Sequence, residues 1–91
     1  MQVLLTKTAR KDLSCIPKDR RSQILQVLRA LENWPIVEGM DIIRLKGYTE
    51  KIYRLRIGDY RVIFLLTEEA IYILRVISRQ DLEKVLRKLQ P

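Results

Sequence analysis

The sequence predicts an α+β fold: a small twisted antiparallel sheet with an N-terminal helical hairpin on one face and a C-terminal helix. Three observations predict it. The first third has apolar residues at helical spacing, the second half has three runs rich in strand-forming residues, and the last run is amphipathic. The 91 residues, of which 47% are apolar, fit one domain over residues 1–91 with one modest core.

The chain is expected to begin with a short strand over residues 2–6. Thr8 can then cap a helix that carries Leu13 and Ile16 at roughly helical spacing. Pro17 breaks that helix, because proline lacks a backbone N–H and suits the first turn of a following helix. We therefore expect a second helix to start directly after it.

The second helix is expected over about residues 18–33. Ile24, Leu28 and Leu31 form one apolar stripe, which Leu25 and Val27 widen. The Asn33-Trp34-Pro35 sequence ends the helix, since a residue before proline is biased away from helical geometry. The first third is thus predicted to be a strand followed by a helical hairpin.

Four strands are expected next, over residues 42–45, 52–57, 60–66 and 70–77. Gly58-Asp59 separates the second and third of these, and a two-residue loop with glycine first is typical of a type II′ hairpin. This turn sets the register, so Ile57 faces Tyr60, Arg56 faces Arg61, Leu55 faces Val62 and Arg54 faces Ile63.

The register places Arg54, Arg56 and Arg61 on one face of the hairpin. The opposite face carries only apolar or aromatic residues, namely Tyr53, Leu55, Ile57, Tyr60, Val62, Phe64 and Leu66. We expect this second face to pack on the helical hairpin. The strand over residues 71–77 is apolar on both faces except at Arg75, so an interior position is expected. The amphipathic run 81–89 can cover the arginine-bearing face.

Composition excludes several kinds of chemistry. The chain has 18 Lys and Arg against 11 Asp and Glu, no histidine, and only Cys15 as cysteine. An intrachain disulfide and a histidine-based catalytic triad are therefore impossible, and no metal or cofactor is expected. No apolar run could span a membrane and the N-terminal residues lack signal-peptide order, so we expect a cytoplasmic protein with no membrane partner. The net charge of +7 favours an anionic partner, either nucleic acid or an acidic protein.

The hairpin concentrates this positive charge. Arginine stays protonated at any relevant pH and binds phosphate oxygens in a bidentate manner, so Arg54, Arg56 and Arg61 indicate an anion site. A solvated face is the alternative. Further candidates for RNA contact are Arg44, Lys46 and Lys51 around the hairpin, and Arg20 and Arg21 on the second helix.

Residues 53–64, Tyr-Arg-Leu-Arg-Ile-Gly-Asp-Tyr-Arg-Val-Ile-Phe, resemble the strand-turn-strand signature of the RelE/ParE toxin superfamily. The Leu45-Lys46-Gly47 step and residues 73–79 extend the similarity. The resemblance implies the toxin of a type II toxin-antitoxin system, a metal-independent endoribonuclease that cleaves mRNA in the ribosomal A site. It also implies a cognate antitoxin, a short acidic chain with a helical segment, that binds the toxin in a hetero-oligomer.

The resemblance also implies residue roles. Arg61 matches the arginine that stabilises the transition state, and Arg79 matches the arginine just after the last strand. Arg54 stands where a basic active-site residue is commonly lysine, with Arg56 as a neighbouring cation. Val85 stands where some relatives have a tyrosine.

Cleavage by attack of the RNA 2′-hydroxyl requires a proton acceptor, charge stabilisation at the phosphate and a proton for the leaving 5′-oxygen. Arginine is a poor base, and Lys46 or Lys51 is a weak candidate for the acceptor, so the acid and base assignments stay open. Two other functions are also open. One is a ParE-like inhibitor of DNA gyrase without nuclease activity, and the other is a non-toxic domain that binds RNA or an acidic protein.

Overall fold

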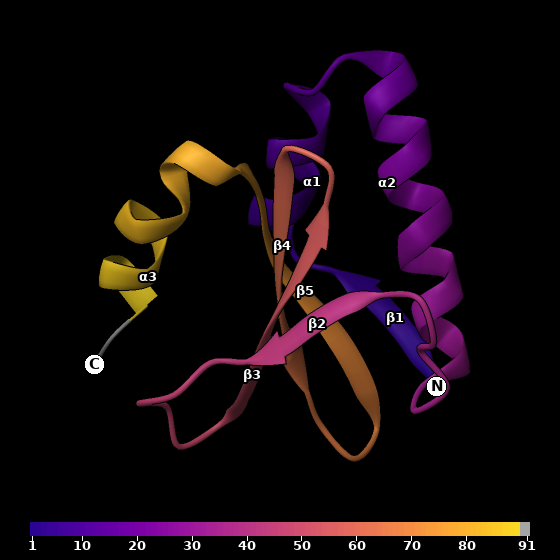
Figure 1. Ribbon diagram of the computed structural model, residues 1–91, viewed down its shortest axis with the longest axis vertical. Coiled ribbons are helices and arrows are strands. Elements are labelled where there is room, and N and C mark those ends of the chain that lie inside the picture. Colours follow the sequence, from indigo (N-terminus) through magenta and orange to yellow (C-terminus); the bar gives the residue numbers. More distant parts are fainter. Residues whose placement is uncertain (90–91) are drawn as a thin grey trace.

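The computed structural model describes residues 1–89 and confirms the predicted fold class. A first strand, two helices, four further strands and a C-terminal helix follow one another along the chain (Figure 1). The elements are β1 (Gln2–Leu5), α1 (Lys7–Ser14), α2 (Lys18–Ala30), β2 (Asp41–Arg44), β3 (Lys51–Ile57), β4 (Tyr60–Leu66), β5 (Ala70–Ser78) and α3 (Leu82–Leu89). Short 3₁₀ helices, η1 (Leu31–Asn33) and η2 (Arg79–Asp81), follow α2 and β5. Over the described range, no helix has the length and apolar character needed to cross a membrane.

The five strands form one sheet in the order β1-β5-β4-β3-β2. Strands β2 to β5 pair antiparallel, as predicted. The prediction of an antiparallel sheet misses one pair, because β1 runs parallel to β5, with Val3 opposite Ile71. A four-residue strand carries no sequence signal for its direction relative to a partner almost 70 residues away.

Helix α1 starts two residues earlier than predicted. Its N-cap is Thr6, not Thr8, and the Thr6 Oγ1 accepts a hydrogen bond from the Ala9 N–H at 3.2 Å. The same hydroxyl donates to the Ile73 carbonyl at 2.8 Å, which ties the start of α1 to β5. Thr8 lies inside the first helical turn, where its side chain cannot cap the helix. Pro17 is the N-cap of α2, directly before the first helical residue.

The main core lies between one face of the sheet and the two N-terminal helices. Strand residues Leu55, Val62 and Phe64 are almost fully buried there and cluster with residues of α1 and α2. We call this side of the sheet the core face. The predicted packing of the apolar hairpin face on the helices is confirmed. Leu25 departs from the predicted helix stripe, since it is 41% exposed.

The opposite side of the sheet carries Arg54, Arg56 and Arg61, and we call it the arginine face. Helix α3 lies on this side, across the sheet from α2 (Figure 1). Val85 of α3 is 6% exposed, and the Tyr48 hydroxyl donates a hydrogen bond to the Leu86 carbonyl at 3.2 Å. The helix therefore covers part of the arginine face and leaves the end of the hairpin near Gly58 outside it.

Candidate functional site on the arginine face

The β3–β4 hairpin has the predicted turn and register. Gly58 has φ +57° whereas Asp59 has a negative φ, which fits a type II′ turn and excludes type I′. Arg56 lies directly opposite Arg61, and Arg54 lies opposite Ile63. Residues two apart on a strand share a face, so the three arginines project from the same side of two neighbouring strands.

Arg61 is buried although it carries a permanent charge. The residue is 8% exposed, and its Nη1 donates to the Gly58 carbonyl at 2.8 Å and to the Tyr60 carbonyl at 3.0 Å. Among the described residues these are the hydrogen bonds that the guanidinium makes. The turn thus fixes one nitrogen of Arg61 and leaves the Nε and Nη2 edge for an anion, the edge that binds phosphate oxygens in a bidentate manner.

Arg54 is held by a carboxylate from the neighbouring strand. Its Nη2 donates to Oδ1 of Asp41 at 2.9 Å, and its Nε is buried without a hydrogen-bond partner in residues 1–89. Asp41 belongs to β2, where it lies directly opposite Arg56. Sequence reasoning missed Asp41 as a member of this site. In the sequence, Asp41 directly precedes the predicted strand 42–45. Its place beside the arginines becomes visible only once the pairing of β2 with β3 is known.

Arg79 reaches the same end of the hairpin from η2. Its backbone N–H donates to the Asp59 carbonyl at 2.9 Å, so the segment after β5 is attached to the β3–β4 turn. The side chain of Arg79 is exposed. The structure therefore brings together all four arginines predicted as catalytic, which we call the arginine site: Arg54, Arg56, Arg61 and Arg79.

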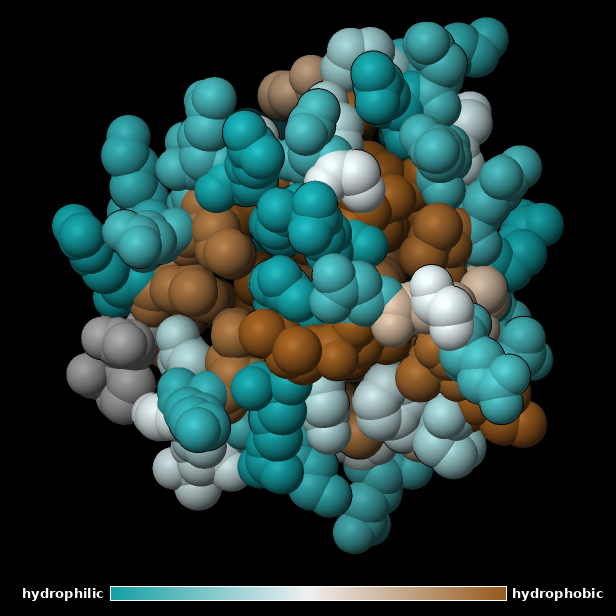
Figure 2. Space-filling view, viewed as in Figure 1, coloured by the Kyte–Doolittle hydropathy of each residue, from teal (hydrophilic) through white to brown (hydrophobic). Residues whose placement is uncertain are grey.

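Burial and like charge both act on Arg61. The pKa of Arg61 is lowered from its ordinary value. Burial is the largest cause, the charge of Arg56 is the next, and Arg54 and Arg79 add to the effect. The carboxylate of Asp41 acts in the opposite direction on the same pKa. Figure 2 shows hydrophilic side chains gathered over the hairpin end of β3 and β4, between apolar surfaces beside α3 and α2. A bound anion would act in the same direction as Asp41 and would relieve more of this repulsion.

The other predicted RNA contacts are not brought to this site. Lys51 opens β3 and lies opposite Leu66, five residues and about 17 Å along the strand from Arg56. Lys46 is in the loop before it, and Arg44 pairs with Tyr53 at the same distal end. Arg20 and Arg21 belong to α2 on the core face of the sheet. Arg21 is half-buried and its Nη2 donates to the Ile16 carbonyl at 3.3 Å, which links α2 to the end of α1.

These placements define what the site can do. Four guanidinium groups can hold a phosphate and stabilise negative charge that develops on its oxygens. Val85, which stands where the resemblance implies a tyrosine in some relatives, is buried and has no ionisable group. Any proton transfer must therefore use another group.

A family profile described as the ParE toxin of the type II toxin-antitoxin system parDE matches residues 3–83. The chain belongs to the RelE/ParE toxin family. It is thus a type II toxin, and the resemblance in the β3–β4 hairpin is confirmed. The toxin RelE3 of Methanocaldococcus jannaschii is 32% identical over 84 residues, which cover 90% of this chain and 94% of the relative.

Two solved structures of relatives agree with this assignment. The toxin resembles a chain in the RelE–RelB complex of Pyrococcus horikoshii, with 34% identity, a TM-score of 0.73 and coverage of 86% of this chain and 93% of the other. It also resembles a chain in the RelB–RelE antitoxin–toxin complex of Methanococcus jannaschii, with 29% identity, a TM-score of 0.76 and coverage of 90% and 96%. Both relatives were crystallised with an antitoxin.

Proposed function

We propose that the toxin is an endoribonuclease that cleaves mRNA on the ribosome through attack of the RNA 2′-hydroxyl on the adjacent phosphate. The observation that carries this proposal is the arginine site, in which the buried guanidinium of Arg61 lies opposite Arg56 with one edge unbonded within the described chain. Such groups stabilise charge on the non-bridging phosphate oxygens as the new bond to phosphorus forms. Arg54 and Arg79 add positive charge around the same phosphate.

Cleavage on the ribosome suits this site because the four arginines lie together at one end of the hairpin, where they can hold a phosphate group. The other candidate RNA contacts lie away from that end. If the ribosome positions the mRNA, it supplies the near-attack geometry that the toxin surface alone does not impose. Arg44, Lys46, Lys51, Arg20 and Arg21 lie away from the scissile phosphate in this proposal. They are proposed contacts to more distant RNA phosphates.

The proposed partners follow from the relatives. Those of Pyrococcus horikoshii and Methanococcus jannaschii were crystallised with RelB, so we propose a cognate antitoxin for this toxin, acting in the cytoplasm. An acidic antitoxin would be attracted by the net charge of +7.

A second function is inhibition of DNA gyrase without hydrolysis of RNA. The observations that favour it are the match to the ParE toxin profile over residues 3–83 and a buried Val85 where some nucleases of the family have tyrosine. Against it, a gyrase inhibitor has no need for four arginines around one phosphate-sized site.

Purified components separate the two functions. The toxin is added to ribosomes programmed with a defined mRNA, and the message is mapped by primer extension; in parallel, it is added to gyrase and supercoiled plasmid. Cuts at codon-phased positions with unaffected gyrase support the nuclease. An intact message together with accumulated gyrase–DNA cleavage complexes supports the inhibitor instead.

A further inference from the structure

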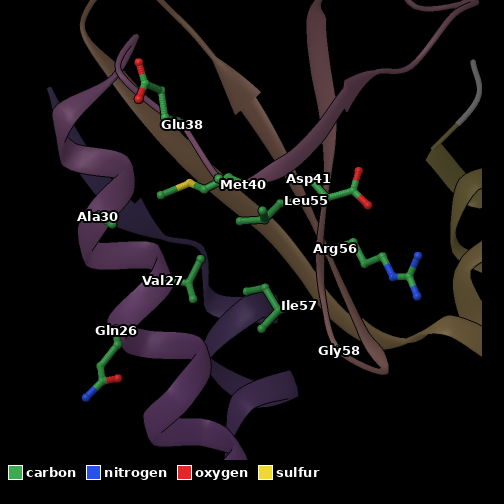
Figure 3. Close-up of a pocket in the computed structure, with 11 residues that line it drawn as sticks. Gln26, Val27, Ala30, Glu38, Met40, Asp41, Leu55, Arg56, Ile57 and Gly58 are labelled. Atoms are coloured by element: carbon green, nitrogen blue, oxygen red, sulfur yellow. The ribbon is translucent and has the colours of Figure 1, made fainter.

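Asp41 is a carboxylate inside a site built for anions. It lies opposite Arg56 across the β2–β3 pair, and its Oδ1 accepts a hydrogen bond from Nη2 of Arg54 at 2.9 Å. Figure 3 shows the side chains of Asp41 and Arg56 extending to the same side of the sheet, away from α2. A negative charge here weakens phosphate binding, so its presence among the arginines calls for another use.

Oδ2 of Asp41 is in a position to react. The Asp41 side chain is 51% exposed, and among the described residues Oδ1 accepts the bond from Arg54 while Oδ2 accepts none. The ion pair fixes the orientation of the carboxylate, so that its second oxygen is presented on the arginine face. Asp41 also lies close enough to Arg61 for its charge to act on that guanidinium.

Other titratable groups do not meet these conditions. Lys51 and Lys46 lie at the distal end of the hairpin, about 17 Å along the strand in the case of Lys51. The Tyr48 hydroxyl donates to the Leu86 carbonyl. Asp81 accepts a hydrogen bond from the Ser78 hydroxyl at 3.1 Å, but its charge acts on Arg75, whereas the charge of Asp41 acts on Arg61. The arginines themselves cannot accept a proton at neutral pH.

We propose that Asp41 is the proton acceptor for the RNA 2′-hydroxyl in the cleavage reaction. The assignment rests on the proposed nuclease function. Oδ2 takes the hydroxyl proton as the 2′-oxygen bonds to phosphorus and the bond from phosphorus to the 5′-oxygen breaks. The leaving 5′-oxygen takes a proton from water, and the hydroxide that forms takes the proton back from Asp41, which restores the carboxylate. The products are a 2′,3′-cyclic phosphate and a 5′-hydroxyl end, and the arginine site carries the charge on the non-bridging oxygens.

The substitution Asp41→Asn separates proton transfer from positioning. Asparagine keeps an oxygen that can accept the bond from Arg54, but it cannot take up a proton. Removal of the negative charge should at the same time favour RNA binding. The proposal therefore predicts that Asp41→Asn lowers the cleavage rate but leaves the affinity for mRNA unchanged or makes it tighter.

The experiment uses the full chain and ribosomes programmed with a defined mRNA. Single-turnover cleavage is measured at saturating toxin, and affinity is measured with an mRNA that carries a 2′-deoxynucleotide at the cleavage position. Asp41→Asn should lower the rate about 100-fold or more, the size expected for a general base. Asp41→Glu should recover part of the rate. Glu38→Gln, which removes an equal charge from the exposed loop before β2, should cleave as the parent does.

Each outcome decides one point. If Asp41→Asn cleaves as fast as the parent, or loses rate only in proportion to a lost affinity, Asp41 is not the proton acceptor while the nuclease function stands. If the parent chain leaves the message intact, the nuclease function fails and the role of Asp41 fails with it. Thermal unfolding of each variant shows whether a lost rate reflects lost folding, and Asp41→Glu gives the second, independent readout.

Discussion

Arg56 and Arg61 lie directly opposite each other on neighbouring strands of the β3–β4 hairpin. Like charges at such a pair destabilise a sheet by up to about 1 kcal/mol, and here Arg54 and Arg79 add to the repulsion. Arg61 is also buried, which increases the cost of its charge. The fold tolerates this arrangement because the turn carbonyls of Gly58 and Tyr60 bind the guanidinium. This repulsion is the reason that we propose the hairpin end as a site for phosphate.

Inorganic phosphate should stabilise the toxin more than chloride at equal ionic strength. A bound phosphate offsets the repulsion within the arginine site, and a ligand that binds only the folded state raises its stability. The measurement is the thermal unfolding midpoint as a function of phosphate concentration. Arg56→Ala should reduce the phosphate-specific increase, whereas Arg29→Ala on α2 should leave it unchanged. An equal increase in the parent and in Arg56→Ala would mean that phosphate binds elsewhere.

Asp12→Ala should lower the free energy of unfolding by about 2 kcal/mol. Loss of an exposed ion pair typically costs less and loss of a buried one more, and the Asp12–Arg75 pair is partly buried. The Asp12 carboxylate accepts bonds from Nε and Nη2 of Arg75 at 2.8 and 3.1 Å and from the Val76 N–H at 2.9 Å, which joins α1 to β5. Urea unfolding measures the change. A loss below about 0.5 kcal/mol, as for an ordinary surface substitution, would show that this link contributes little.

The contribution of Arg75 to stability should not change between neutral and moderately alkaline pH. The hydrogen bonds that Arg75 donates to Asp12 raise the pKa of Arg75 above its ordinary value. A raised pKa in the folded state gives stability that is complete below the unfolded pKa and is lost only as pH rises through the folded pKa, which for an arginine lies far above pH 9. Arg75→Met should therefore cost the same free energy of unfolding at pH 7 and pH 9. A cost that falls between these values would contradict the assignment.

Gly58→Ala should destabilise the hairpin by about 1–2 kcal/mol, because an L-residue with a side chain is strained at positive φ. The φ of Gly58 is +57°, and a Cβ added there would meet no atom within 4 Å, so the expected cost is conformational and not steric. Gly58→Asn should cost less, since asparagine tolerates the left-handed region better. Equal losses for the two variants in urea unfolding would point to a cause other than backbone strain.

The parts of the fold that could be predicted are those encoded by short-range patterns. The two-residue Gly58-Asp59 turn determines the register of β3 and β4, and with it the common face of Arg54, Arg56 and Arg61. The helices followed from apolar spacing and Pro17. The recognisable hairpin also indicated the family.

Features that depend on long-range pairing could not be predicted. Asp41 joins the site only because β2 pairs with β3 across the loop that separates them, and no alternation fixes that register. The parallel pairing of β1 with β5 and the selection of Thr6 over Thr8 as the cap both depend on contacts with β5. Arg20 and Arg21 lie far from the arginine site because α2 covers the core face, on the opposite side of the sheet.

The most direct test of the central claim is the rate at which Arg61→Ala cleaves mRNA on programmed ribosomes, compared with the parent and with Arg29→Ala. Arg61 is the buried guanidinium around which the site is built, and loss of one such donor typically lowers the rate by about 10²–10³-fold. The account predicts a loss of this size for Arg61→Ala and none for Arg29→Ala, with the same folded structure by circular dichroism. Cleavage by Arg61→Ala at the parent rate would contradict it.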